Sequence, residues 1–425
     1  MSSVGRVLWP RSWREEYKGR VSTPTPSRPS RRPLGLLLVA FAVLVVGVNL
    51  RPGATSVGPL MAQVVEAYGQ GAFASGLLTA LPPLIFGALG LLAVPVSRRL
   101  GMTGTIIASF VVVALGLLLR PSTEVFALFV GLSVLGLLGP ALGNVLVPAW
   151  IKLHGGTRTV GLMTLYSVTL ALGGSAGSAL AVPLAGSGAD GWTDSLRVWG
   201  VVVAVPVVVW AVVLTRTRHD FPPDPPRGEV PGSLLRSPTA IALTLMFALQ
   251  SLNAYTQFGM LPQILADAGI SPARAGVLVA VIAGWGLVGG MVMPTVIAKA
   301  PGLPWIVGGF GLLTAAGYLG LLLAPAVSPL LWACVLGLGG FAFPTAIALL
   351  PARTRSPLIT ARLSGMVQPI GYLLAALGPI AAGMLLGVTG STSVVLWFLA
   401  GTGLLLAVAG YRVGLPRLVD HEIGS

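Results

Sequence analysis

The sequence predicts an all-α membrane protein with twelve transmembrane helices, arranged as two halves of six helices each. The 425 residues are 55% hydrophobic and only 9% charged, whereas soluble domains carry about 25% charged residues. Apolar runs of about 20 residues, the length that crosses a hydrocarbon layer of about 30 Å, recur along the chain. One charged, proline-rich stretch separates these runs into two groups of six.

The expected parts follow one another along the chain. A disordered basic tail at 1–33 is followed by a six-helix half at 34–214, a linker at 215–238, a second half at 239–412 and a tail at 413–425. The spans expected in the first half are 34–62, 75–96, 104–120, 124–151, 160–185 and 195–214. Those expected in the second half are 239–262, 274–298, 304–324, 329–351, 362–388 and 392–412. No short apolar segment with a cleavage site precedes the first span, so we expect no cleaved signal peptide.

The positive charges are distributed unevenly about these spans. If both termini face the cytoplasm, all of the 26 Lys and Arg residues except Arg51, Arg120, Arg197 and Arg274 lie in cytoplasmic tails and connectors. This asymmetry is what the positive-inside rule requires. We therefore expect a multi-pass protein of the plasma (inner) membrane with both termini cytoplasmic. The net charge of +14 is spread over short connectors, so we expect no nucleic-acid partner.

The two halves resemble each other at an offset of about 204 residues, which is typical of duplicated transporter halves with substrate bound between them near the midplane. Gly174 corresponds to Gly378, and Pro148 corresponds to Pro351. The glycine-rich runs that begin at Gly173 and Gly378 are typical of surfaces where helices pack closely.

Arg51 is the one charged residue that the pattern places away from a membrane surface. A cation at the bilayer centre costs about 2.5–3.5 kcal/mol and usually has a function. Its guanidinium stays charged and its planar fork suits a carboxylate-like or small planar anion. An alternative is that Arg51 reaches the outer surface, since it lies about 27 Å along a helix from Pro33. Residues 52–62 are mostly apolar or small, which predicts a continuing helix and a position in a cavity.

Polar side chains inside other spans are expected to face the bundle interior, because lipid offers them no partners. The candidate substrate-binding residues are Arg51, Asn49, Asn144, Tyr166, Gln250, Asn253, Tyr255, Trp285 and Gln368. For each candidate other than Arg51 and Asn49, a hydrogen bond between helices is the alternative role. The cluster from Gln250 to Gln257 is the strongest, because one helix carries four polar groups within it.

Other kinds of chemistry lack the residues that they need. No Asp or Glu lies deep in an expected span, and the histidines His154, His219 and His421 are expected to be solvated. The sequence has no metal-ligand cluster and no phosphate-binding loop, so we expect no metal, no cofactor and no enzymatic activity. Cys334 is the single cysteine. Uniport, anion exchange and protonation of the substrate itself all remain compatible with this pattern.

Several stretches resemble one family. Asn49-Leu50-Arg51-Pro52, followed by Thr55-Ser56-Val57-Gly58-Pro59-Leu60, resembles the first helix of the CynX/NimT-type (cyanate and 2-nitroimidazole) branch of the major facilitator superfamily. Gly143-Asn144-Val145-Leu146-Val147-Pro148 with Lys152, and Gly161-Leu162-Met163-Thr164 with Tyr166, are similar to its fourth and fifth helices. Leu249-Gln250-Ser251-Leu252 with Tyr255 resembles its seventh helix, so the resemblance spans most of residues 34–412.

The resemblance implies a transporter that moves a small, anionic or planar solute by alternating access, and we expect it to function as a monomer. Two departures matter. Ser97 stands where the superfamily signature carries an acidic residue, and Gly173-Gly174 lacks the proline of the drug-antiporter signature. The alternatives are a drug or metabolite efflux transporter, a membrane sensor that does not transport, and a membrane-embedded enzyme.

Overall fold

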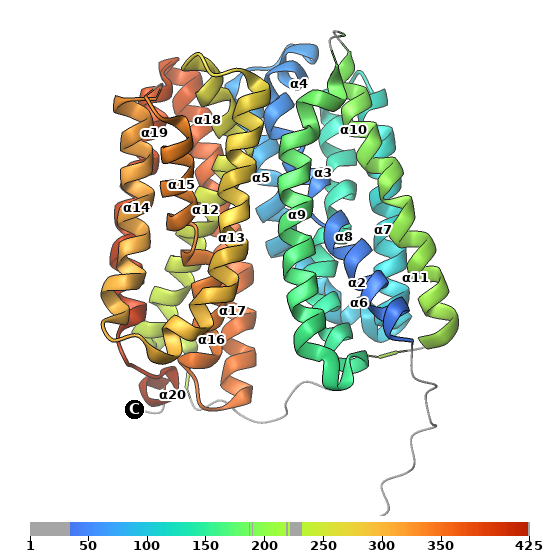
Figure 1. Ribbon diagram of the computed structural model, residues 1–425, viewed down its shortest axis with the longest axis vertical. Helices are drawn as coiled ribbons and strands as arrows, with labels where there is room; N and C mark the ends of the chain where they lie inside the picture. The colour runs from blue at the N-terminus through green and yellow to red at the C-terminus, as the bar shows by residue number, and fades with distance from the viewer. Residues whose placement is uncertain are drawn as a thin grey trace, which may run out of the picture.

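The computed structural model describes residues 35–186, 188, 190–217, 220–221, 232–325 and 327–423, and all regular secondary structure in these ranges is helical. The basic tail and the middle of the linker lie outside these residues. Figure 1 shows two bundles side by side, the N-terminal bundle (α2–α11) and the C-terminal bundle (α12–α20), with α5 between them.

The helices of the two bundles have the following bounds. The N-terminal bundle contains α2 (Leu36–Asn49), α3 (Pro52–Thr55), α4 (Met61–Ala67), α5 (Ala72–Leu89), α6 (Ala93–Leu100), α7 (Met102–Leu119), α8 (Phe126–His154), α9 (Thr159–Ala185), α10 (Gly191–Val202) and α11 (Ala204–Thr217). The C-terminal bundle contains α12 (Pro238–Asp267), α13 (Pro272–Lys299), α14 (Leu303–Leu323), α15 (Pro329–Gly339), α16 (Ala342–Ala352), α17 (Pro357–Ala375), α18 (Leu377–Thr389), α19 (Thr392–Gly414) and α20 (Val419–Ile423).

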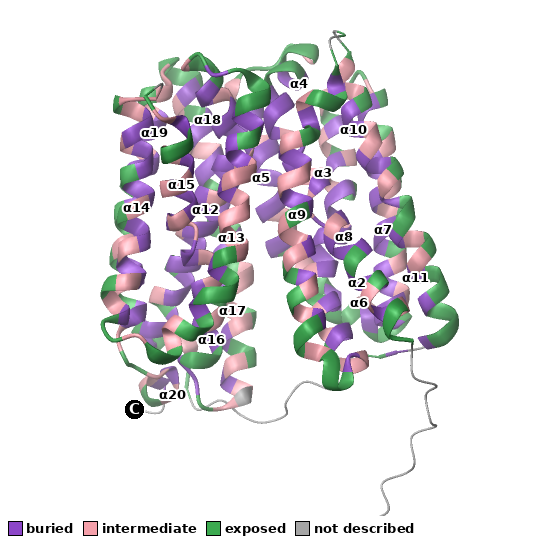
Figure 2. Ribbon diagram, viewed as in Figure 1, coloured by how far each residue is buried: buried purple, intermediate pink, exposed green. Residues whose placement is uncertain are grey.

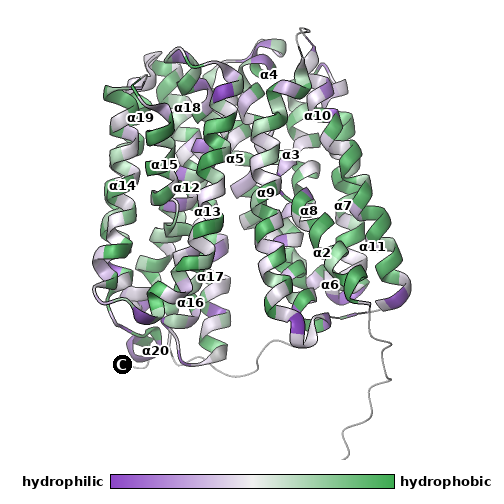
Figure 3. Cartoon of the chain, viewed as in Figure 1, coloured by the Kyte–Doolittle hydropathy of each residue, from purple (hydrophilic) through white to green (hydrophobic). Residues whose placement is uncertain are grey.

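Eleven segments of the described chain are long and apolar enough to cross a membrane. They coincide with the expected spans except for α12, which has 30 residues but carries polar groups such as Gln250, Asn253 and Gln257. These groups lower its mean hydropathy, and all three are buried. With α12, the membrane segments number twelve. Figures 2 and 3 show exposed, hydrophobic ribbon along the outer sides of the bundles, as a lipid-facing surface requires.

The first membrane segment is not one continuous helix, so the expectation that the helix continues through Pro52 is wrong. It runs from Leu36 to Ala67, but α2 ends at Asn49 and α3 begins at Pro52. Proline has no N–H, and its ring clashes with the carbonyl four residues earlier. Glycines of α9 pack against this break, and a β-carbon at Gly173 would overlap the Val48 carbonyl. The break is therefore held by close packing against α9.

The first residues after α11 are anchored to the N-terminal bundle. Asp220 is fully buried, and its carboxylate accepts hydrogen bonds from the Thr103 backbone N–H (3.0 Å) and hydroxyl (2.6 Å) at the start of α7. A carboxylate is favoured at a helix N-terminus by the helix dipole. His154 Nε2 lies 3.8 Å from this carboxylate, and its ring stacks on Trp150 at 4.5 Å. The expectation that His154 is solvated is thus wrong, because Trp150 and Asp220 enclose it.

A second carboxylate holds the start of α12. Glu422 of α20 accepts hydrogen bonds from the Thr239 N–H (3.0 Å), the Thr239 hydroxyl (2.8 Å) and the Ser237 hydroxyl. Burial alone would raise the pKa of Glu422, but these hydrogen bonds and the charge of Arg417 together lower it. The folded state therefore favours the ionised carboxylate, and its contribution to stability is present above the pKa of the unfolded chain.

We expect Glu422→Gln to lower the stability of the C-terminal bundle by about 1 kcal/mol at neutral pH, because the site is partly solvent-exposed. The contribution of Glu422 is lost as the pH falls through its lowered folded-state pKa. As the pH falls from 7, the melting temperature of the detergent-purified variant should therefore decrease less than that of the wild type. If the melting temperatures of the two proteins change with pH in parallel, the role assigned to Glu422 is contradicted.

Candidate functional site

A cavity of about 870 Å³ lies between the two bundles. It is lined by residues of α9, α12, α13 and α16, together with Arg51 and Thr55. It reaches Thr159 and Val160 in the first turn of α9, where Val160 is exposed. This turn lies at the end of the molecule where α2 begins (Figure 1). The cavity therefore runs from the middle of the protein toward that end.

The bundles meet at the opposite end through small residues. A β-carbon at Gly58, next to α4, would overlap the Phe258 carbonyl oxygen of α12. A β-carbon at Gly76 of α5 would lie 2.5 Å from the Pro379 carbonyl oxygen of α18. Each pair joins one bundle to the other by backbone contact. The protein is thus open at one end of the cavity and closed by these glycine contacts at the other.

Arg51 lies at the deep end of the cavity, in the break between α2 and α3. It is halfway along the 32-residue segment from Leu36 to Ala67. Its guanidinium interacts with the Tyr255 phenol, and its charge also acts on Tyr166 and Tyr372. The structure thus favours the cavity position over the surface position for Arg51. The helix break sets the direction of this side chain, because Pro52 starts a new helix immediately after it.

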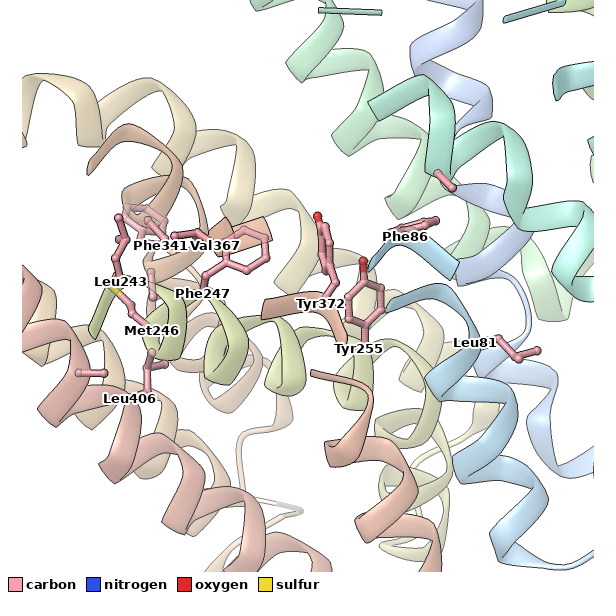
Figure 4. Close-up of a cluster of buried hydrophobic side chains, with 14 of the residues drawn as sticks. Leu81, Phe86, Leu243, Met246, Phe247, Tyr255, Phe341, Val367, Tyr372 and Leu406 are labelled. Carbon is pink, nitrogen blue, oxygen red and sulfur yellow. The ribbon is translucent and has the colours of Figure 1, made fainter. Parts of the chain in front are cut away.

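Aromatic side chains from three helices meet beside Arg51. Tyr255 of α12, Tyr372 of α17 and Phe86 of α5 have ring centroids 5.9–6.2 Å apart, in edge-to-face arrangements. Figure 4 shows Tyr255 and Tyr372 next to each other with their hydroxyls on the same side. Edge-to-face packing of this kind fixes ring orientation. The group orients the Tyr255 ring, so that its hydroxyl can act together with Arg51.

Three of the nine candidate residues line the cavity: Arg51, Gln250 and Tyr255. Gln250 is buried, and its Oε1 has no hydrogen-bond partner among the described residues. A buried amide oxygen without a partner is costly unless a ligand or water donates a hydrogen bond to it. Tyr166 lies behind the cavity wall, where its hydroxyl donates to Asn144 Oδ1 at 3.4 Å. These two residues lie near Arg51 without being among those that line the cavity.

The remaining four candidates are occupied in helix packing. Asn49 donates to the Val45 carbonyl at 2.8 Å. Asn253 donates to the Leu249 carbonyl, and its Oδ1 accepts from Thr402 of α19 at 3.2 Å. Gln368 donates to the Ser364 hydroxyl at 2.8 Å. Trp285 packs against Phe341, with ring centroids 6.2 Å apart. The structure does not bring these four side chains to the cavity.

Three hydroxyl residues of the cavity wall were missed by the sequence reasoning: Thr164 and Ser167 of α9 and Ser251 of α12. Gln257, which belongs to the expected polar cluster of α12, also lines the cavity. Gln257 donates to the Tyr318 hydroxyl at 2.9 Å. Periodicity gave no signal for the three hydroxyl residues, because polar groups lie on more than one face of these helices. Which side chains line the cavity depends on how the helices are rotated relative to one another.

Arg120 was expected in an outer loop, and it does lie in the short turn Arg120–Ser122 between α7 and α8, but its burial was missed. It follows α7 and is only 2% exposed. Its Nη1 donates to the Gly53 carbonyl oxygen at 3.1 Å. The sequence shows only a charge followed by proline at the end of an apolar run, which is typical of a loop. Burial of this arginine results from the position of α3, which no local pattern predicts.

The cavity has a simple charge distribution. Arg51 is the only ionised side chain among the described residues that line it. The other lining groups are hydroxyls, amides, one phenol and apolar side chains. A fixed positive charge in a poorly hydrated space attracts an anion or the negative end of a polar solute. The described lining can therefore bind such a solute through Arg51.

Two bundles of membrane-spanning helices around a central cavity that is open at one end define a membrane transport protein. Residues 37–357 match the Major Facilitator Superfamily, and the chain belongs to this superfamily, in its CynX/NimT-type branch.

Two curated relatives place it in that branch. The chain is 32% identical over 383 residues to the 2-nitroimidazole transporter of Escherichia coli (strain K12), covering 90% of this chain and 96% of that protein. It is 28% identical over 355 residues to the cyanate transport protein CynX of the same organism, covering 83% of this chain and 90% of that protein. The protein is thus a multi-pass membrane transporter of a small molecule.

A solved structure shares the fold. A bacterial homologue of the human lysosomal transporter Spinster, in an inward-facing and unoccupied conformation, matches with a TM-score of 0.71 and 16% identity. The match covers 91% of this chain and 97% of that chain. At this identity, the likeness is one of architecture, and the solute of the present protein has to be argued from its own residues.

Proposed function

We propose that the protein transports a small anion, or a small planar solute rich in electrons, across the plasma membrane by alternating access. It acts as a monomer with both termini in the cytoplasm, so that the open end of the cavity faces inward. The observation that carries the proposal is Arg51, the one ionised side chain among the described residues that line the cavity, half-way along its membrane segment. Its guanidinium binds the solute, and Gln250 and Tyr255 complete the binding site with hydrogen bonds.

The relatives support the same class of solute. Cyanate is a small linear anion, and 2-nitroimidazole is a planar ring with a polar nitro group. Both solutes suit a guanidinium next to aromatic side chains. The guanidinium donates hydrogen bonds in one plane, and aromatic rings stack on flat solutes. The cavity volume of about 870 Å³ exceeds what either solute needs and sets no tight upper limit on size.

Efflux of larger organic molecules is a second candidate, favoured by the apolar part of the cavity wall. Met163, Phe258, Met291 and Phe343 all line it. Methionine and aromatic side chains are typical of sites that accept varied apolar ligands. A positive charge at the deep end argues against cationic drugs, so this candidate is restricted to neutral or anionic molecules.

Uptake into proteoliposomes distinguishes these candidates. The purified protein is reconstituted and presented with cyanate, nitrate, benzoate, imidazole and 2-nitroimidazole, each with and without a pH gradient. We expect saturable uptake of at least one small anion or azole above the level of protein-free liposomes, and no competition from cationic dyes. Competition by cationic dyes, or uptake of such dyes, would contradict the proposed class of solute.

A further inference from the structure

A second, smaller chamber lies beyond Arg51, on the side away from the open cavity. Its volume is about 40 Å³. It is lined by residues of α3, α5, α8 and α12, with Arg120. Arg51, Thr55, Tyr255 and Phe258 line both spaces and so form the wall between them. The chamber thus continues the line of the cavity toward the closed end.

Arg120 reaches this chamber with unused hydrogen-bond donors. One of its nitrogens, Nη1, donates to the Gly53 carbonyl oxygen. Its Nε and Nη2 are buried and have no hydrogen-bond partner among the described residues, and the same holds for the Ser133 hydroxyl of α8. Both residues line the chamber. Buried donors of a charged group rarely stay unpaired, so such a cluster points to a bound ion or water.

The charges of the chamber point to an anion. Its described lining includes two guanidinium groups and no Asp or Glu. Arginine stays protonated in proteins, so neither charge can be relieved by proton loss. A buried guanidinium without an opposite charge is costly. An anion held by Arg51 and Arg120 would satisfy the free donors and compensate the buried charge of Arg120.

The volume limits which anions fit. Measured in the same way, the chamber has about 40 Å³ and the open cavity about 870 Å³. The open cavity therefore has room for ring solutes and small anions alike, whereas the chamber favours the smallest anions.

We propose that the chamber between Arg51 and Arg120 is a second anion site, specific for monatomic and triatomic monovalent anions such as azide and cyanate. It rests on the proposed function, since Arg51 belongs to both sites. An anion bound at Arg51 from the open cavity can pass to Arg120 when Tyr255 and Phe258 move apart. Planar ring solutes stop at Arg51 in this conformation, and Arg120 takes no part in binding them.

Anion-induced thermal stabilisation of the purified protein tests this site without measuring transport. Azide is the probe, and 2-nitroimidazole is the comparison ligand. A ligand that binds only the folded state raises the melting temperature in a saturable way. We expect azide to stabilise the wild type, and Arg120→Met and Arg120→Gln to lose at least about ten-fold in apparent azide affinity. Stabilisation by 2-nitroimidazole should stay within about two-fold in both variants. Arg274→Ala, which replaces an exposed arginine in the first turn of α13, is the control and should bind azide like the wild type.

If Arg120→Met does not fold, Ser133→Ala replaces it, because it removes one free hydroxyl of the chamber and leaves the arginine in place. A weakened azide response in this variant supports the site. Azide affinity that is unchanged in Arg120→Gln and in Ser133→Ala overturns it. Failure of the proposed function looks different: no anion or azole is taken up by proteoliposomes, while azide still stabilises the wild type and not the Arg120 variants.

Discussion

Replacing Arg51 with alanine will lower anion transport by about 30-fold or more, because truncating one partner of a buried charge pair costs about 2–5 kcal/mol. Arg51→Gln should behave similarly, since it keeps hydrogen bonding but loses the charge. Arg51→Lys should retain part of the activity, because it keeps the charge but not the planar fork. Initial uptake rates over a range of solute concentrations, measured in proteoliposomes, check all three.

The control for these variants is Arg197→Ala. Arg197 is an arginine of α10 whose side chain is exposed and lies 3.1 Å from Asp194. Its loss should leave transport within about two-fold of the wild type, as expected of an exposed ion pair. Transport that is unchanged in all three Arg51 variants would remove Arg51 from the solute site. The transporter fold, which rests on the chain as a whole, would stand.

The second large effect is expected at Gly58. A methyl group at this position would overlap the Phe258 carbonyl oxygen across the two bundles, and the rigid backbone on both sides leaves the contact no easy way to relax. Overpacking of this kind costs about 1–3 kcal/mol. Gly58→Ala should therefore disfavour closure at this end and slow transport by about ten-fold or more, since closure is one half of the alternating cycle.

Thiol labelling reports this change directly. A cysteine is placed at Ala54, which lines the inner chamber, in a Cys334→Ser background that has no other cysteine. A membrane-impermeant reagent applied to the side of α4 should label it faster when Gly58→Ala is present. Gly131→Ala is the control, because nothing lies within 4 Å of its added β-carbon. Equal labelling rates in the Gly58 and Gly131 variants would show that the Gly58 contact does not govern closure.

The membrane segments were predictable from the sequence because their length and apolarity are local properties. The helix breaks were not. Pro82 and Pro83 lie inside a continuous α5, whereas Pro52 begins a new helix. Proline alone therefore does not decide whether a membrane helix is interrupted. The difference at Pro52 is the packing of Gly173 and Gly177 of α9 against the chain at the break, which only the tertiary structure reveals.

The sequence predicted only part of the candidate site: Arg51, Gln250 and Tyr255 line the cavity, and the other six candidates do not. Arg51 stood out because an isolated charge within an apolar run is rare. The sequence could not show which way Asn253 points, because α12 carries polar groups on several faces. In the structure its amide binds the Leu249 carbonyl and the Thr402 hydroxyl. Arg120 was hidden for the opposite reason, since its position at the end of a run looks like a loop. The rotation of α12 determines where Asn253 points, and the path of α3 determines the burial of Arg120.

The polarity of α12 also bears on how the protein enters the membrane during synthesis. Its amides make it the least apolar of the membrane segments, and buried amides weigh against insertion of an isolated helix. Two of its polar contacts, from Gln257 to Tyr318 of α14 and from Asn253 to Thr402 of α19, use partners that are synthesised later. Until those helices arrive, α12 needs the translocon or the finished N-terminal bundle to shield its amides. The polar contacts of α12 are thus completed only near the end of translation, when α19 reaches its place.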